Sequence, residues 1–183
     1  MNGTKTLVAA LGAGMLLCTA APSFADTAAD TLFLTNAIRG NMAEIKTADL
    51  AEQRAASEDV RDYGKMLSND HAKALQKHAG VARDKNVPVP TEVTQEQKQQ
   101  YDALAKLSGA EFDREFMQHM IDEHQKVITM YEAEAASKGD PDVVDLAKDT
   151  LPKLRDHLAE AQKIATGGPT RTSQRTDHDR RLE

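Results

Sequence analysis

The chain has 183 residues, of which 40% are hydrophobic and 4% aromatic, and its formal net charge is −6 at pH 7. This acidic balance, with no basic helix face, argues against a nucleic-acid-binding protein. The single cysteine, Cys18, lies in the first 25 residues, so the rest of the chain has no thiol for a disulfide or a metal.

The first 25 residues have the pattern of a secretory signal peptide. Lys5 precedes an apolar stretch over residues 6–21, and Ser23-Phe24-Ala25 forms a small-x-small cleavage site. The apolar stretch is short for a spanning helix. We therefore predict a signal peptide over 1–25, a periplasmic location, and no stable membrane insertion after cleavage.

Four long segments then show the 3.6-residue period of amphipathic helices, and none alternates like a strand. They span about 27–56, 58–85, 108–137 and 141–165, and Asp140 with Pro141 suits a helix start. Pro88 and Pro90 interrupt the middle connection, where Thr94 and Gln97 resemble a capping box for a short helix over 95–107.

Two further features complete the predicted domain plan. Pro152 lies inside the last long segment and predicts a kink or a local break. From Gly167 onward the chain is polar and arginine-rich, which predicts a disordered tail over 167–183. Two helical hairpins with a long connection predict an all-α, up-down four-helix bundle over residues 26–166.

Four ionisable side chains lie at the centres of the otherwise apolar helix faces: Glu44, His71, His124 and His157. Glu44 and His71 are each about 13 residues from the first hairpin turn, and His124 and His157 about 16 from the second, so each pair lies level. Docking in up-down-up-down order at matching height would place one of them on each helix around the bundle axis.

Such a set is costly to bury unless it is paired or bound to a metal. Imidazole and carboxylate are donors for zinc, iron or copper, so we predict one divalent ion, with zinc favoured. Asp70 and Met120 are predicted as an extra ligand or as a partner of a ligand. A metal-free hydrogen-bonded network of the same side chains is the alternative.

The other histidines are poorer candidates. His78 shares the face of His71 but lies two turns away, which suggests a core position. His119 is more than about 90° from the centre of its helix face and is predicted to be exposed. His178 lies in the predicted tail.

With these residues identified, the chain resembles an exported bacterial family known as domain of unknown function 4142, which has a ferritin-like bundle. The resemblance covers residues 31–164 and rests on the Met66–His71 segment, on Phe112-Asp113 followed by Met120 and His124, on Leu151-Pro152 followed by His157-Leu158, and on Glu44 after Gly40. It implies a helical bundle, export and metal association.

Ferritin-like di-iron proteins carry two Glu-x-x-His motifs, but no glutamate stands three residues before His71, His124 or His157. The chain therefore favours a mononuclear site. The leading hypothesis is a periplasmic metal-binding bundle that acts in metal handling or envelope stress. A metal-dependent redox or hydrolytic enzyme and a metal-free structural or partner-binding bundle are the alternatives.

Overall fold

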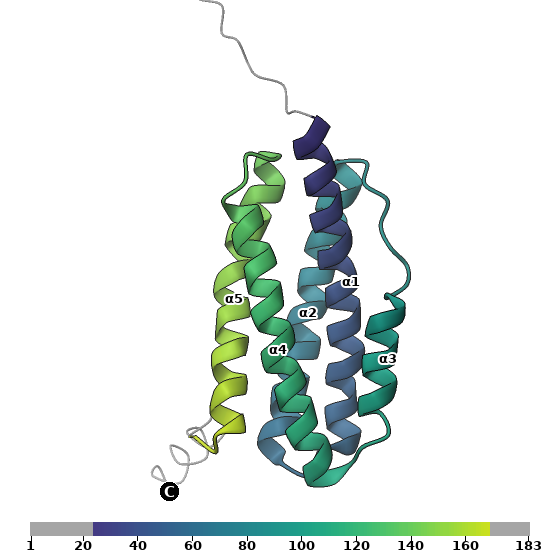
Figure 1. The fold of residues 1–183 in the computed structure, drawn as a ribbon, viewed down its shortest axis with the longest axis vertical. Coiled ribbons are helices and arrows are strands. Elements are labelled where there is room, and N and C mark those ends of the chain that lie inside the picture. The colour runs from purple at the N-terminus through teal and green to yellow at the C-terminus, as the bar shows by residue number, and fades with distance from the viewer. Residues whose placement is uncertain (1–23, 169–183) are drawn as a thin grey trace, which may run out of the picture.

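The computed structural model describes residues 24–168, which form five helices and no strands in that range. The helices are α1 (Phe24–Arg54), α2 (Glu58–Asp84), α3 (Gln95–Leu104), α4 (Gly109–Ala135) and α5 (Pro141–Ala165) (Figure 1). The four long predicted helices and the short one are confirmed to within about three residues at each end. Most of the predicted signal peptide, residues 1–23, and the tail residues 169–183 lie outside the described residues.

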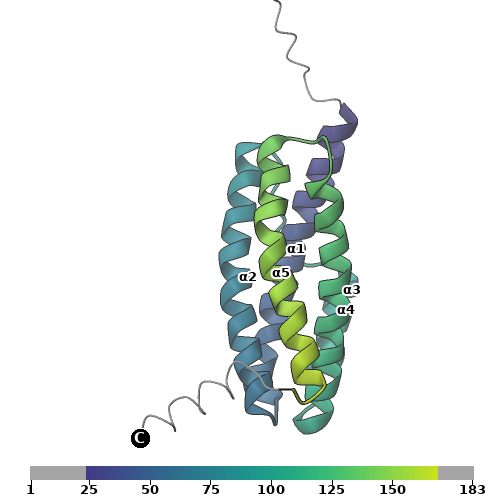
Figure 2. The ribbon, with the colours of Figure 1, turned by 90° about the vertical axis from the view of Figure 1, so that its left-hand side faces the viewer.

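The four long helices pack side by side, and each is antiparallel to its two main neighbours. α1 packs against α2 and α4, and α5 packs against the same two helices from the opposite side (Figures 1 and 2). α3 contacts α1 and α4 on the outside of the bundle. In cross-section the four long helices thus form a square, made of the hairpins α1–α2 and α4–α5, and α3 packs on the outside of this square.

The predicted up-down-up-down order is wrong, because the middle connection runs the length of the bundle. At one end the Asp113 carboxylate of α4 accepts hydrogen bonds from the amides of Ala56 and Ser57, where α2 begins. At the other end Lys85, which follows α2, pairs with Asp140 and Asp142 at the start of α5. The helices α2 and α4 therefore run in the same direction, and α5 runs opposite to both.

Three different kinds of interaction fix the starts of α3, α5 and α2. Thr94 and Gln97 form the predicted capping box of α3. The Asp140 side chain accepts a hydrogen bond from the Asp142 amide, with Pro141 in the first turn of α5. Ser57 makes no side-chain cap for α2, whose start is held instead by the long-range bonds of Asp113.

α5 is continuous through Pro152, so the predicted local break does not occur. Pro152 lies on the exposed face of α5. Its ring removes one backbone hydrogen bond, but water can reach the carbonyl on that face and satisfy it. None of the helices within residues 24–168 is long and apolar enough to cross a membrane.

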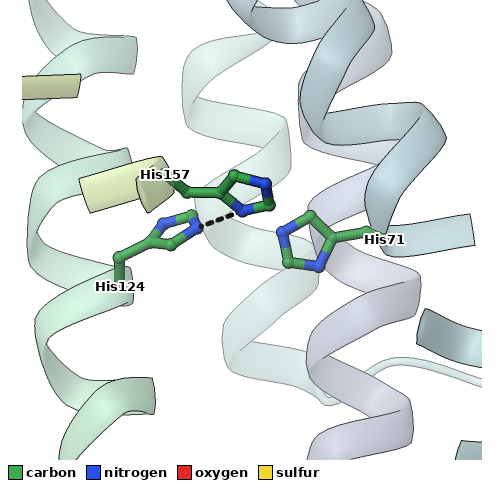
Figure 3. A group of neighbouring side chains, drawn as sticks. All are labelled: His71, His124 and His157. Atoms are coloured by element: carbon green, nitrogen blue, oxygen red, sulfur yellow. Dashed lines mark hydrogen bonds between the residues drawn. The ribbon is translucent and has the colours of Figure 1, made fainter. Parts of the chain in front are cut away.

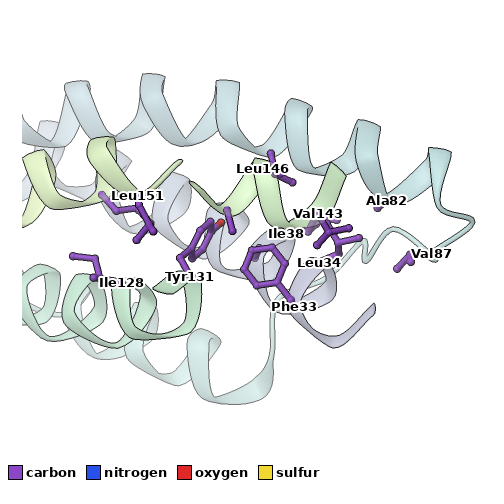
Figure 4. Packing of buried hydrophobic residues seen from close by; sticks show 13 residues of the cluster. Phe33, Leu34, Ile38, Ala82, Val87, Ile128, Tyr131, Val143, Leu146 and Leu151 are labelled. Atoms are coloured by element: carbon purple, nitrogen blue, oxygen red, sulfur yellow. The ribbon is translucent and has the colours of Figure 1, made fainter. Parts of the chain in front are cut away.

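The interior contains two apolar clusters with a polar layer between them. The first cluster packs Phe33, Leu34 and Ile38 of α1 against Tyr131 and residues of α5 (Figure 4). The second is built around Phe112, Phe116 and Leu67. Between them lie Glu44, His71, His124 and His157, all less than 9% exposed.

α1 and α2 approach closely below this polar layer. A Cβ at Gly64 of α2 would lie 2.6 Å from the Cβ of Ala51 and 2.8 Å from the carbonyl oxygen of Ala48 on α1. Only a residue without a side chain fits such an approach. These small residues thus allow α1 and α2 to pack closely beside the polar layer that contains Glu44 and His71.

Candidate metal centre

Three histidines from three helices point toward one another in the polar layer (Figure 3). His71 comes from α2, His124 from α4 and His157 from α5, and their ring centroids are 5.3–5.8 Å apart. One ring nitrogen from each lies within 4.8 Å of the others, and no other such group of three or more potential metal-binding side chains occurs within residues 24–168. We call these three residues the histidine triad.

Outer hydrogen bonds fix which nitrogen of His71 carries the proton. The Asn41 amide nitrogen donates to the Ala37 carbonyl at 2.8 Å, so its oxygen faces Nδ1 of His71, at 2.9 Å. An amide oxygen only accepts, so Nδ1 of His71 carries hydrogen and Nε2 carries a lone pair. That Nε2 is buried and has no hydrogen-bond partner.

His124 and His157 are oriented in the same manner. Nδ1 of His124 donates to the Met120 carbonyl at 2.9 Å, and Nε2 of His157 donates to the Asp70 carboxylate at 3.1 Å. The remaining nitrogens, Nε2 of His124 and Nδ1 of His157, face each other at 3.3 Å. With these tautomers no hydrogen lies between them, so two lone pairs meet. Tyr63 supports this end of the site by donating to the His157 carbonyl.

Burial keeps the three rings neutral. It lowers the pKa of His71 well below its ordinary value, an effect that the neighbouring imidazoles strengthen. Burial also lowers the pKa of His124 and brings that of His157 to about 4, even though the Asp70 hydrogen bond opposes the change. For Asp70 itself, burial raises the pKa, but hydrogen bonds from His157 and Lys153 outweigh burial and hold it below its ordinary value.

Three lone pairs that converge inside the bundle repel one another, and a cation removes that repulsion. Each imidazole donates its other N–H to a carboxylate or carbonyl oxygen, the arrangement that orients metal-binding histidines. Nitrogens held about 2 Å from one ion lie about 3.3–3.6 Å apart. The 3.3 Å separation already fits that spacing. The widest separation allowed by the 4.8 Å limit needs a closing movement on the order of 1 Å.

The structure does not bring Glu44 into the triad. Its Oε1 lies 3.9 Å from Nδ1 of His124, the nitrogen that faces away from the other two histidines. Burial raises the pKa of Glu44 to about 7, and the neighbouring His119 acts in the opposite direction. Its Oε2 is buried without a hydrogen-bond partner.

The two predicted auxiliary residues both contact the triad, each through a hydrogen bond to a histidine. Asp70 holds His157 by its carboxylate. Met120 holds His124 by its backbone carbonyl, while its side chain packs in the second apolar cluster. His78 is a buried core histidine, as expected, because the Ala74 carbonyl and the Tyr131 hydroxyl satisfy both of its nitrogens. His119 is half-buried, more enclosed than its position on the helix suggested.

A cavity of about 60 Å³ adjoins the triad. It is lined by all three histidines, by Glu44 and Asn41, and by residues of α3 and α4 nearer the surface. This volume exceeds that needed for one water molecule, about 10–15 Å³ on the same measure. An ion on the triad would therefore have space beside it for a further small ligand.

The sequence did not point to Asn41, although it orients His71. The signal was present, because Asn41 is a polar residue one turn before Glu44 in a stripe of small and apolar residues. Polar residues in such a stripe need partners when they are buried. Asn41 is 5% exposed and meets this need with two hydrogen bonds.

Several solved structures share the fold at low sequence identity. A crystal structure of a DUF305 fragment from Deinococcus radiodurans superposes with a TM-score of 0.66 at 14% identity, covering 75% of this chain and 95% of that one. CopM in its Cu(I)-bound form gives a TM-score of 0.63 at 20% identity, and in its Cu(II)-bound form 0.63 at 19%; both cover 75% of this chain and 96% of CopM. At these identities the likeness establishes a shared fold.

A sequence comparison with curated proteins finds no match. The match to a protein family, in contrast, extends from the end of the apolar N-terminal stretch to the last turn of α5. It is to a family described as Domain of unknown function (DUF4142) and covers residues 17–164, so the chain belongs to this family.

Proposed function

We propose that the protein binds one transition-metal ion through His71, His124 and His157 and acts in metal handling. The observation that carries this proposal is the convergence of three bare imidazole nitrogens, one of which, Nε2 of His71, is buried without a partner. The outer hydrogen bonds already use the N–H group of each ring, so the three inner nitrogens cannot donate to one another, which favours a bound metal over the alternative of a metal-free polar network.

For the identity of the ion, we place copper before zinc and iron. Three imidazoles suit all three metals, so the donor set does not select among them. The structures that share the fold include CopM with Cu(I), Cu(II) and Ag bound. The zinc preference drawn from the donor types has no comparable support. We also propose a ferritin-like arrangement of the bundle, without the dinuclear centre, since the triad offers donors for a single ion.

Metal analysis of purified protein tests the proposal. Mass spectrometry and titration calorimetry with copper and zinc should show one ion per chain, and His71→Ala should lose it. His78→Gln is the matched control, because it removes a buried histidine that lies outside the triad. Absence of copper and zinc binding at micromolar concentration, or equal loss in the control, would refute the proposal.

We place this function in the periplasm, supported by the charge, apolar stretch and cleavage pattern of residues 1–25. Metal handling or protection of the cell envelope under metal stress fits that compartment. Cell fractionation of the tagged full-length chain tests the location, and cleavage after Ala25 should be visible in the intact mass. A cytoplasmic, uncleaved product would contradict it.

The cavity beside the triad favours a second candidate, a metal-dependent catalyst. Catalytic metal sites keep three protein ligands and an open position, whereas structural sites are closed by four. The triad supplies three nitrogens, and about 60 Å³ of space adjoins them. Azide binding to the copper-loaded protein, followed by absorbance, tests for an open position; its failure would leave metal handling as the better account.

A further inference from the structure

The two sides of the cavity differ in the polar groups that line them. Toward α2 and α5 its lining contains Asp70 and Lys153, whose side chains pair at 3.3 Å, so the lysine ammonium lies at that side. Toward α1, α3 and α4 the lining contains Glu44, Glu123 and His119, with the side chains of Gln97 and Gln100. A cation approaching from α2 and α5 meets a carboxylate already paired with an ammonium and with His157, whereas the other side presents two carboxylates, an imidazole and two amides.

Glu44 is the innermost of the carboxylates on the second side. It is 8% exposed, its Oε2 has no hydrogen-bond partner, and it lines the same cavity as the triad. Glu123, further out, is engaged by the exposed ammonium of Lys126 at 2.8 Å. A buried carboxylate oxygen without a donor is costly, and a cation in the cavity would supply the missing partner.

The wall of the cavity at this point is made of small residues. Gly40 and Ala43 of α1 lie on the lining, and a Cβ added at Gly40 would meet no atom within 4 Å. Gly40 therefore faces open space beside the cavity. The gap between α1 and α4 is left open by the absence of a side chain there.

We propose that the gap between α1 and α4, beside α3, is the route by which a metal ion reaches the triad, and that Glu44, with His119 and Glu123, forms a transient cation site along it. This inference rests on the proposed function. It gives Glu44 a role distinct from that of a ligand of the final site. The Glu44 carboxylate binds the ion first, on the Nδ1 side of the His124 ring. The ion then moves to the three nitrogens of the histidine triad that carry lone pairs.

A transient site lowers the barrier for association and dissociation alike, so its loss slows both and leaves the equilibrium affinity unchanged. Stopped-flow absorbance with Cu²⁺ alone gives the association rate, and displacement by excess chelator gives the dissociation rate. Glu44→Gln keeps the shape and removes the charge, and we expect the association rate to fall roughly tenfold, within the range of electrostatic steering. The dissociation rate should fall by the same factor, because the ion leaves through the same transient site. Gly40→Leu fills the gap and should slow both rates as well.

Gly80→Leu is the matched control. Gly80 also lies within a helix and also has no atom within 4 Å of an added Cβ, but it does not line the cavity. Equal slowing in Gly80→Leu and Gly40→Leu, or wild-type rates in both Glu44→Gln and Gly40→Leu, would overturn the inference alone. Faster dissociation and weaker affinity in Glu44→Gln would show that Glu44 is a ligand. Absence of triad-dependent Cu²⁺ binding in the wild type would overturn both proposals.

Discussion

Replacing His124 with leucine should change stability in opposite directions with and without metal. In the metal-free protein, the wild-type triad holds Nε2 of His124 3.3 Å from Nδ1 of His157 and leaves Nε2 of His71 unpartnered. An unsatisfied buried polar atom costs about 1–3 kcal/mol. Leucine is of similar size and apolar.

The hydrogen bond that His124 loses costs little in this substitution. Nδ1 donates to the Met120 carbonyl four residues earlier, and a helix also supplies that carbonyl with a backbone amide. We therefore expect metal-free His124→Leu to equal the wild type or to exceed it by up to about 2 kcal/mol in the free energy of unfolding.

Metal binding should make the wild type more stable than His124→Leu, the reverse of the order expected without metal. An ion at 100 times its dissociation constant stabilises the folded wild type by about 2.7 kcal/mol. For a domain of this size that corresponds to a rise in Tm of roughly 10 °C. His124→Leu loses one of the three nitrogens and should show little or no rise.

Urea denaturation followed by circular dichroism, once in chelator and once with copper, measures both effects. A metal-free variant less stable than the wild type by more than about 1 kcal/mol would refute the idea that the bare lone pairs destabilise the empty site. An undiminished copper shift in the variant would show that the ion binds elsewhere.

Three further outcomes are expected. Asp70→Ala removes the acceptor that orients His157 and should weaken metal affinity about 10–100-fold in calorimetry, with wild-type affinity as the contrary result. Acid should destabilise the metal-free protein, because burial lowers the pKa of His71, His78, His124 and His157, so below pH 6.5 the unfolded chain binds protons that the folded chain does not. The raised pKa values of Glu44, about 7, and of buried Glu134 oppose this as two groups against four. Urea denaturation at pH 6.5 and 5 should show a net loss, and an unchanged free energy of unfolding would contradict it. Gly64→Ala should cost about 1–3 kcal/mol by forcing α1 and α2 apart, whereas the same change at the unhindered Gly80 should stabilise by up to about 1 kcal/mol; similar effects at both would contradict the close approach.

The helices and the level of the polar residues could be predicted because both depend on local geometry. Helical periodicity gave the faces, and equal distances from a turn placed His124 opposite His157 and Glu44 opposite His71. The direction of the second hairpin could not be predicted in this way. It depends on how the 23 residues from 86 to 108 cross the bundle, and on the long-range bonds of Asp113 and Lys85.

Helix geometry also could not predict that Glu44 would lie apart from the three histidines. A face assignment places a residue within about a quarter turn, which does not distinguish the Nε2 side of His124 from its Nδ1 side. That choice is made by side-chain rotation and by the Met120 carbonyl, which takes the Nδ1 hydrogen. The role of Asn41 depends likewise on a contact between helices.

The two hairpins pack more extensively within themselves than against each other. The second hairpin carries His124 and His157, and the first carries only His71. An ion bound by all three would therefore link the two hairpins to each other. Separating the two hairpins would reduce the donor set from three nitrogens to two at most. A partner that separated the hairpins could thereby take the ion without competing for every ligand, and mechanical opening would become the means of metal release.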